Sequence, residues 1–258
     1  MFNASKMIPD IIKYIKEWEE SNYKGCNVVI GMSGGKDSTI IAKLLIDALG
    51  ANRVIGVALP QGDQSINEAD KICEWLGIEY MCVNIGDACT AVEASVCKNM
   101  ELTHRTVQNI PPRIRMTTLY AIAQSCNGVV VNTNNYSEAY IGYGTIYGDC
   151  ATGAFSPLGH ITVTEIYQIG DSLGIPSKWV HKTPDDGLPH STSDEEKFGF
   201  TYEELDKYIR DGIEPEGYCH NNPGEELKWH KIDRLHNENL FKTKFVDTFE
   251  PNINNYYD

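Results

Sequence analysis

Residues 28–38 read VVIGMSGGKDS, and this stretch decides the class of fold. The β-branched run 28–30 is typical of a buried strand, and the apolar run 40–50, IIAKLLIDALG, is typical of a helix. Between them, Gly31, Gly34 and Gly35 permit a tight turn whose backbone N–H groups can bind an anion. A helix that begins directly after such a turn adds its partial positive charge. The stretch therefore predicts a strand, a phosphate-binding loop and a helix.

The loop differs from a Walker A motif. Only three residues separate Gly31 from Gly35, and Asp37 follows Lys36 where Ser or Thr is required. An acidic side chain in a phosphate loop repels phosphate unless it holds a metal ion, and Mg²⁺ bridging ATP oxygens is the natural candidate. We therefore predict ATP and Mg²⁺ as ligands. The alternative is a turn that only connects strand to helix, and the density of small residues argues against it.

Composition excludes several classes of protein. The 258 residues carry a formal net charge of -14 and no long Lys/Arg run, which disfavours nucleic acid as a partner. No apolar run approaches membrane-spanning length, and the N-terminus is typical of an amphipathic helix rather than a signal peptide. The eight cysteines form no CxxC pair, which predicts reduced thiols and a cytoplasmic protein. Cys219-His220 lacks a second ligand pair, so no metal site is predicted there.

Strand and helix patterns alternate along the chain. We predict strands at 28–32, 54–59, 80–85 and 129–133, and helices at 36–49, 67–77, 87–100, 113–126 and 164–174. Pro111-Pro112 is expected to begin the helix at 113. The pattern predicts one α/β domain over 1–258, with a parallel sheet, helices on both faces and ligands at the carboxyl ends of the strands. The polar segments 185–200 and 250–258 are expected to be mobile.

Two further groups carry candidate chemistry. Glu138 follows the fourth predicted strand, which ends at Thr133, so Asp37 and Glu138 can face one Mg²⁺ at the same edge of the sheet. The alternative for Glu138 is a first-turn acid that stabilises a helix. Arg113 and Arg115 lie two residues apart and do not share a helix face, so we expect them to make different contacts. Arginine suits bidentate binding of phosphate or carboxylate, and ordinary surface charge is the alternative.

Six blocks of the chain, taken in order, resemble ammonia-dependent NAD synthetase. They run from about residue 28 to 210 and read SGGKDS, NIPPRIRMTTLYAIAQ, SEAYIGYGTIYGD, FSPLGHITVTEIYQIG, LGIPSKWVHKTPDDGL and SDEEKFGFTYEELDKYI. The first block alone indicates only the wider ATP-pyrophosphatase superfamily. The resemblance implies a Rossmann-like, adenine-nucleotide α-hydrolase-type fold. It also implies a ligase of NAD biosynthesis that adenylates the nicotinate carboxylate of deamido-NAD and amidates it with ammonia, giving NAD, AMP and pyrophosphate.

The resemblance also implies roles for individual residues. Lys36, Asp37 and Ser38 are the implied catalytic residues, and Asp37 and Glu138 the implied ligands of Mg²⁺. Contacts to ATP or the dinucleotide substrate are implied for Thr133, Arg113 and the loop residues Gly31, Met32, Ser33, Gly34, Gly35, Lys36, Asp37 and Ser38. For the lysine near the C-terminus we favour Lys242 over Lys231. A homodimer is implied as well, and the chain has no room for a glutaminase domain, so free ammonia is the expected donor.

Three positions depart from the family pattern. Ile146 stands where a basic residue is usual, Ala154 where Asp is usual, and Asp185 where Ser or Thr is usual. The first two are positions at which the family meets deamido-NAD, and the third lies near ATP. The departures leave open a slower NAD synthetase or an AMP-forming amide ligase for another carboxylate. A nucleotide-binding pseudoenzyme is a third alternative, and the complete SGGKDS loop argues against it.

Overall fold

The computed structural model describes residues 2–64, 66–182, 193–219 and 226–244. Within these residues, β1 (Asn27–Gly31), β2 (Val54–Ala58), β3 (Glu79–Cys82) and β4 (Gly128–Val130) form one sheet in the order β3-β2-β1-β4. All neighbouring pairs are parallel, with Val29 opposite Ile55 on one side and Val130 on the other. The carboxyl ends of β1 and β4 therefore lie side by side, as the sequence predicts.

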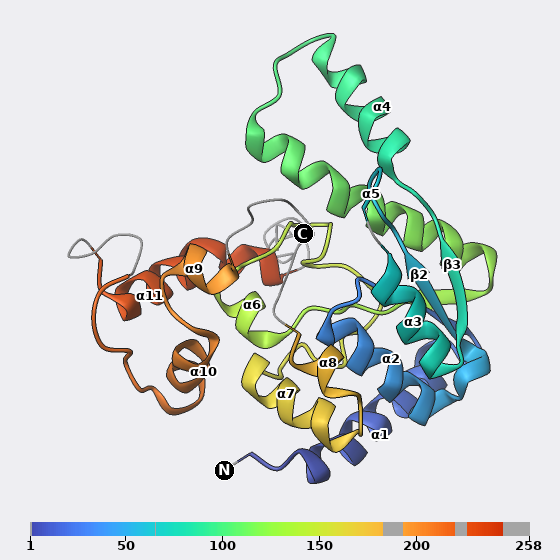
Figure 1. Cartoon of the computed structure of the whole chain (residues 1–258), viewed down its shortest axis with the longest axis horizontal. Coiled ribbons are helices and arrows are strands. Elements are labelled where there is room, and N and C mark those ends of the chain that lie inside the picture. Colours follow the sequence, from blue (N-terminus) through green and yellow to red (C-terminus); the bar gives the residue numbers. More distant parts are fainter. Residues whose placement is uncertain (1, 65, 183–192, 220–225, 245–258) are drawn as a thin grey trace, which may run out of the picture.

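Helices cover both faces of the sheet (Figure 1). On one face lie α1 (Ala4–Asn22), α2 (Lys36–Leu49), α3 (Asn67–Leu76), α7 (Val163–Ser172) and α8 (Ser177–Val180). On the other face lie α4 (Gly86–Cys97) and α5 (His104–Ser125). Alternation along the strands produces this two-sided core, because successive side chains point to opposite faces. Val28 and Ile30 pack with α1 and α2, whereas Val29 packs with α5.

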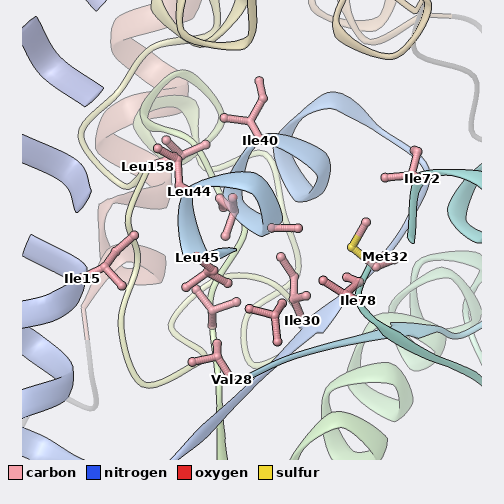
Figure 2. Close-up of a cluster of buried hydrophobic side chains, with 14 of the residues drawn as sticks. Ile15, Val28, Ile30, Met32, Ile40, Leu44, Leu45, Ile72, Ile78 and Leu158 are labelled. Carbon is pink, nitrogen blue, oxygen red and sulfur yellow. The ribbon is translucent and has the colours of Figure 1, made fainter. Parts of the chain in front are cut away.

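The larger cluster is built around α2 (Figure 2). Ile40, Leu44 and Leu45 of this helix are fully buried between Ile15 of α1 and the strand residues Val28 and Ile30. Leu158 closes the same cluster from the segment that precedes α7. This packing holds the N-terminus of α2 at the carboxyl end of β1, where the glycine-rich loop lies.

A second group of helices stands beside this core and forms its own small cluster. It contains α6 (Tyr136–Ile141), α9 (Asp194–Phe198), α10 (Tyr202–Asp211) and α11 (Lys228–Asn239), joined by Ile141, Phe200, Leu205 and Ile232. The described residues also include two 3-10 turns, Ala51–Arg53 and Leu240–Thr243. In Figure 1, α9, α10 and α11 lie on the far side of α6 from the sheet, so α6 stands between the two parts of the molecule.

The α/β fold and helix 36–49 are confirmed, and apart from the start of α5 the predicted strand and helix ends differ from the observed ones by at most three residues. The predicted start of the helix at residue 113 is wrong. α5 begins at His104, so Pro111 and Pro112 lie inside it. Thr103 caps the earlier turn by accepting a bond from Thr106 N at 3.2 Å, and Ile110 and Pro111 are buried. These contacts offset the hydrogen bonds that two prolines remove.

Other expectations fall partly outside the described residues. Asp185 and the segment 250–258 lie outside them, whereas α9 occupies 194–198, where the sequence predicts only a polar, turn-rich segment. All eight cysteines carry free thiols. In the part of the chain that the structure describes, no helix combines the length and the apolar character needed to cross a membrane.

Candidate active site

The loop from Gly31 to Gly35 joins β1 to α2 and forms one wall of a cavity of about 770 Å³. Gly34 has φ +80°, in the left-handed region, and a Cβ added there would lie 3.1 Å from Glu68 Cβ. Only glycine fits both the conformation and this close approach. Gly35 precedes the first turn of α2, so the positive end of a 14-residue helix faces the cavity.

Side-chain hydroxyl groups stabilise this loop by hydrogen bonds. Ser33 Oγ accepts a hydrogen bond from Gly35 N at 3.2 Å and lies 3.3 Å from Ser38 Oγ. The Gly35 carbonyl accepts from Thr39 Oγ1 at 2.8 Å and from Ser38 Oγ at 3.2 Å. Ser38 is buried and does not belong to the described cavity wall, so in this structure it supports the loop.

The opposite wall follows β4. Thr133 and Glu138 both line the cavity. Asn135 caps α6, and its Oδ1 accepts from Glu138 N at 2.9 Å. Ser137, the residue before Glu138, donates a hydrogen bond from its hydroxyl to Asp206 of α10 and accepts one from Val163 N at 2.9 Å. Because Ser137 is fully buried, this network sets the position of Glu138 beside it.

Asp37, Glu138 and Lys36 form a compact group of charges between the two walls. Lys36 Nζ lies 3.1 Å from Asp37 Oδ2, and 11% of the lysine side chain is exposed. Burial, together with the neighbouring Asp37 carboxylate, raises the pKa of Glu138 to about 8, against the opposing effect of Lys36. Burial also opposes the charge of Lys36, but Asp37 and Glu138 outweigh it and raise the pKa of its ammonium group. Lys36 therefore stays protonated, while Glu138 carries a proton at neutral pH for much of the time.

This group suits a divalent cation. Asp37 Oδ1 is buried and has no hydrogen-bond partner among the described residues. The described cavity wall holds five acidic side chains against three basic ones. Such a wall repels a triphosphate unless a cation is added, and two carboxylates are the hard oxygen donors that Mg²⁺ prefers. Asp37 and Glu138 thus fit the metal that the sequence predicts.

Several residues of the cavity wall were missed by sequence reasoning. They are Gln64, Glu68, Asp149, Lys182, Asp194 and Tyr202. The Tyr202 hydroxyl is buried without a hydrogen-bond partner in the described part of the chain, and burial raises its pKa. Glu68 lies in the first turn of α3 and accepts from Trp179 Nε1 at 3.0 Å, which no local pattern indicates.

The two arginines of α5 make different contacts, as their spacing predicts. Arg115 lines the cavity, and its guanidinium donates to the Leu59 carbonyl at 3.0 Å and to Gln64 Oε1 at 3.2 Å. Arg113 is exposed, lies outside the described wall, and donates to the Ile146 carbonyl at 3.1 Å. Arg115, rather than Arg113, thus places a cation in the cavity.

Neither C-terminal lysine belongs to the described wall. Lys242 Nζ donates to the carbonyl oxygens of Gly142 at 2.8 Å and Gly144 at 3.3 Å. Lys231 Nζ donates to the Phe198 carbonyl at 2.6 Å. Both lysines therefore bind backbone carbonyls at or just after the C-terminal ends of short helices, an interaction that the helix dipole favours.

A parallel α/β sheet with a phosphate-type loop after its first strand and two carboxyl groups lining the same cavity is typical of a nucleotide-using enzyme. The NAD synthase family model matches residues 7–246. The chain is 34% identical to the NH(3)-dependent NAD(+) synthetase of Finegoldia magna, with 98% of this chain and 100% of that protein covered. The chain belongs to the NH(3)-dependent NAD(+) synthetase family, whose members are ATP-using ligases of NAD biosynthesis.

Solved structures agree with this assignment. NMN synthetase from Francisella tularensis superposes with a TM-score of 0.82 at 29% identity, covering 98% of this chain and 100% of that one. NH3-dependent NAD synthetase from Campylobacter jejuni gives a TM-score of 0.74 at 26% identity, covering 97% and 100%. The fold is therefore shared over nearly the whole length of both proteins.

Proposed function

We propose that the cavity between the Gly31–Asp37 loop and Glu138 carries out the reaction for which the family is named. The chain converts deamido-NAD to NAD with ATP and ammonia. A carboxylate oxygen of the nicotinate ring attacks the α-phosphorus of ATP, and the bond to pyrophosphate breaks. Ammonia then attacks the activated carbonyl carbon, the bond to AMP breaks, and the nitrogen loses a proton. The observation that carries this proposal is a glycine-rich loop and helix N-terminus that line one cavity together with the carboxyl groups of Asp37 and Glu138.

The chain's own residues neutralise and orient the reacting groups. The loop amides and the N-terminus of α2 face the phosphates, and Lys36 and Arg115 supply positive charge within the same wall. Asp37 and Glu138 would hold Mg²⁺, which when bound neutralises phosphate charge. No side chain has to act as a nucleophile, because holding the carboxylate near the α-phosphorus supplies much of the rate.

The remaining assignments are part of the same proposal. Thr133 contacts ATP from the β4 side, Ser38 holds the loop, and Arg113 meets the acid substrate on the exposed side of α5. Lys242 reaches the substrate only if it leaves the carbonyls of Gly142 and Gly144, which makes it the most demanding of these roles. We propose a cytoplasmic homodimer of one 258-residue domain that uses free ammonia.

A second candidate reaction is the formation of NMN from the corresponding mononucleotide acid. The Francisella protein that superposes at TM-score 0.82 is an NMN synthetase. Ile146 and Ala154 lie outside the described wall of the cavity and stand where the family pattern has charged residues. An altered substrate half beside a complete phosphate loop is what a different nicotinate substrate would require.

The test offers both acids to the purified chain with ATP, Mg²⁺ and ammonium, and measures AMP and the amide product by chromatography. The main proposal expects AMP and NAD in equal amounts. AMP with the mononucleotide acid but not with deamido-NAD selects the second reaction. Without ammonium, exchange of labelled pyrophosphate into ATP that depends on the acid isolates the first step. No AMP and no exchange with either acid refutes both reactions and leaves an amide ligase for another carboxylate or a nucleotide-binding pseudoenzyme.

A further inference from the structure

Lys36 occupies an unusual place for a lysine, because it lies within the proposed cation site itself. Its ammonium is 3.1 Å from Asp37 Oδ2 and interacts electrostatically with Glu138. On another side, Nζ lies 5.6 Å from the centre of the Tyr167 ring. The two groups that would bind a divalent cation are thus also the two acidic side chains that act most strongly on the charge of this lysine.

An ammonium group and a divalent cation at one pair of carboxylates oppose each other. Each stabilises the carboxylates, but the two positive charges repel, and the side chains of Lys36 and Asp37 are only 11% and 20% exposed to the water that would screen them. A divalent cation bound to Asp37 must therefore displace the ammonium group of Lys36, or bind more weakly because of its repulsion. Lys36 is the first residue of α2, beside the loop amides that face the phosphates, and its four-carbon chain is flexible. A triphosphate on the loop would offer the ammonium another anionic partner within reach.

We propose that Lys36 is an internal counter-ion that weakens divalent-cation binding to Asp37 and Glu138. When a triphosphate binds to the loop, the ammonium group of Lys36 pairs with it, and this weakening is removed. Lys36 is then a positioning residue that orders ligand binding, with the nucleotide promoting the metal. By linkage, the metal must promote the nucleotide by the same factor. This inference rests on the proposed cation site of the enzyme.

The first test measures Mn²⁺ affinity without nucleotide, from the free Mn²⁺ signal in electron paramagnetic resonance. Lys36→Met and Lys36→Gln should bind Mn²⁺ at least tenfold more tightly than the wild type, whereas Lys36→Arg should stay within about threefold. The Gln variant keeps a donor for Asp37 in case the Met variant folds poorly, and circular dichroism checks both. Lys43→Met is the matched control, because Lys43 lies on the same helix and pairs with Asp47, away from the cavity.

The second test measures binding of α,β-methylene ATP by calorimetry in the presence of EDTA. Lys36→Gln should bind this analogue at least tenfold more weakly than the wild type. Opposite effects on the two ligands are diagnostic, since a lysine that only supported the loop would weaken both. The inference is overturned if the folded Lys36→Gln variant binds Mn²⁺ no more tightly than the wild type. Because neither measurement needs turnover, such a result leaves the proposed reaction to be judged by AMP formation alone.

Discussion

Replacing Glu138 by Gln should change the pH dependence of stability. The substitution keeps the shape of the side chain and removes its charge from the wall shared with Asp37. In the wild type, burial and Asp37 raise the pKa of Glu138 to about 8 from its ordinary value of 4.5. The folded protein then holds a proton that the unfolded chain releases. The contribution of Glu138 to stability is therefore retained below pH 4.5 and is lost as the pH rises toward 8.

The size of this effect follows from the difference between the two pKa values. A pKa of about 8 against 4.5 corresponds to about 5 kcal/mol when the group is fully shielded. Glu138 keeps part of its surface open to the cavity, so we expect about 2–4 kcal/mol. Near pH 4.5 the Gln variant and the wild type should have the same free energy of unfolding. At pH 8.5 the free energy of unfolding of the Gln variant should be higher by about 2–4 kcal/mol.

The assay is urea unfolding followed by circular dichroism from pH 4.5 to 8.5, with EDTA present. Glu74→Gln serves as the control, because Glu74 is an exposed residue of α3 and its removal changes the net charge equally. The difference in free energy of unfolding between Glu74→Gln and the wild type should not change with pH across this range. If the difference between Glu138→Gln and the wild type is also independent of pH, this result refutes the argument, since Glu138 would then ionise freely in the folded protein.

Three further substitutions test the site and its support. Asp37→Ala should reduce AMP formation at least a hundredfold with an unchanged circular dichroism spectrum, and undiminished turnover would show that its metal role is misassigned. Asp206→Ala removes the acceptor of bonds from Ser137 Oγ and from Thr164 N at 2.7 Å, so it should lower the free energy of unfolding by about 2–4 kcal/mol; a loss below about 1 kcal/mol in urea titration would contradict this. Tyr202→Phe deletes a buried hydroxyl without a described partner, so the melting temperature should stay level or rise while amide formation falls about tenfold. A lower melting temperature with full activity would mean that the hydroxyl serves the fold instead.

Local patterns were sufficient for the α/β class and for one half of the site. The strand, loop and helix at 28–49 depend on neighbouring residues, because glycine conformation, helix propensity and apolar periodicity act over a few positions. Helix 36–49 and the cavity-lining residues Gly31 to Asp37 accordingly lie where the sequence predicts them. Glu138 lines the same cavity as the loop for a topological reason, since neighbouring parallel strands end at the same edge of the sheet.

Tertiary packing decided the rest. Nothing near Pro111 indicates that α5 continues through it, because the compensating contacts of Ile110 come from residues distant in the chain. Arg115 rather than Arg113 faces the cavity because of how α5 packs on the sheet, which a two-residue spacing leaves open. Tyr202 and Asp194 reach the site only because the cluster around α6 brings α9 and α10 beside Glu138. Such contacts join residues more than fifty positions apart, and their free energy is gained only when the whole chain has folded.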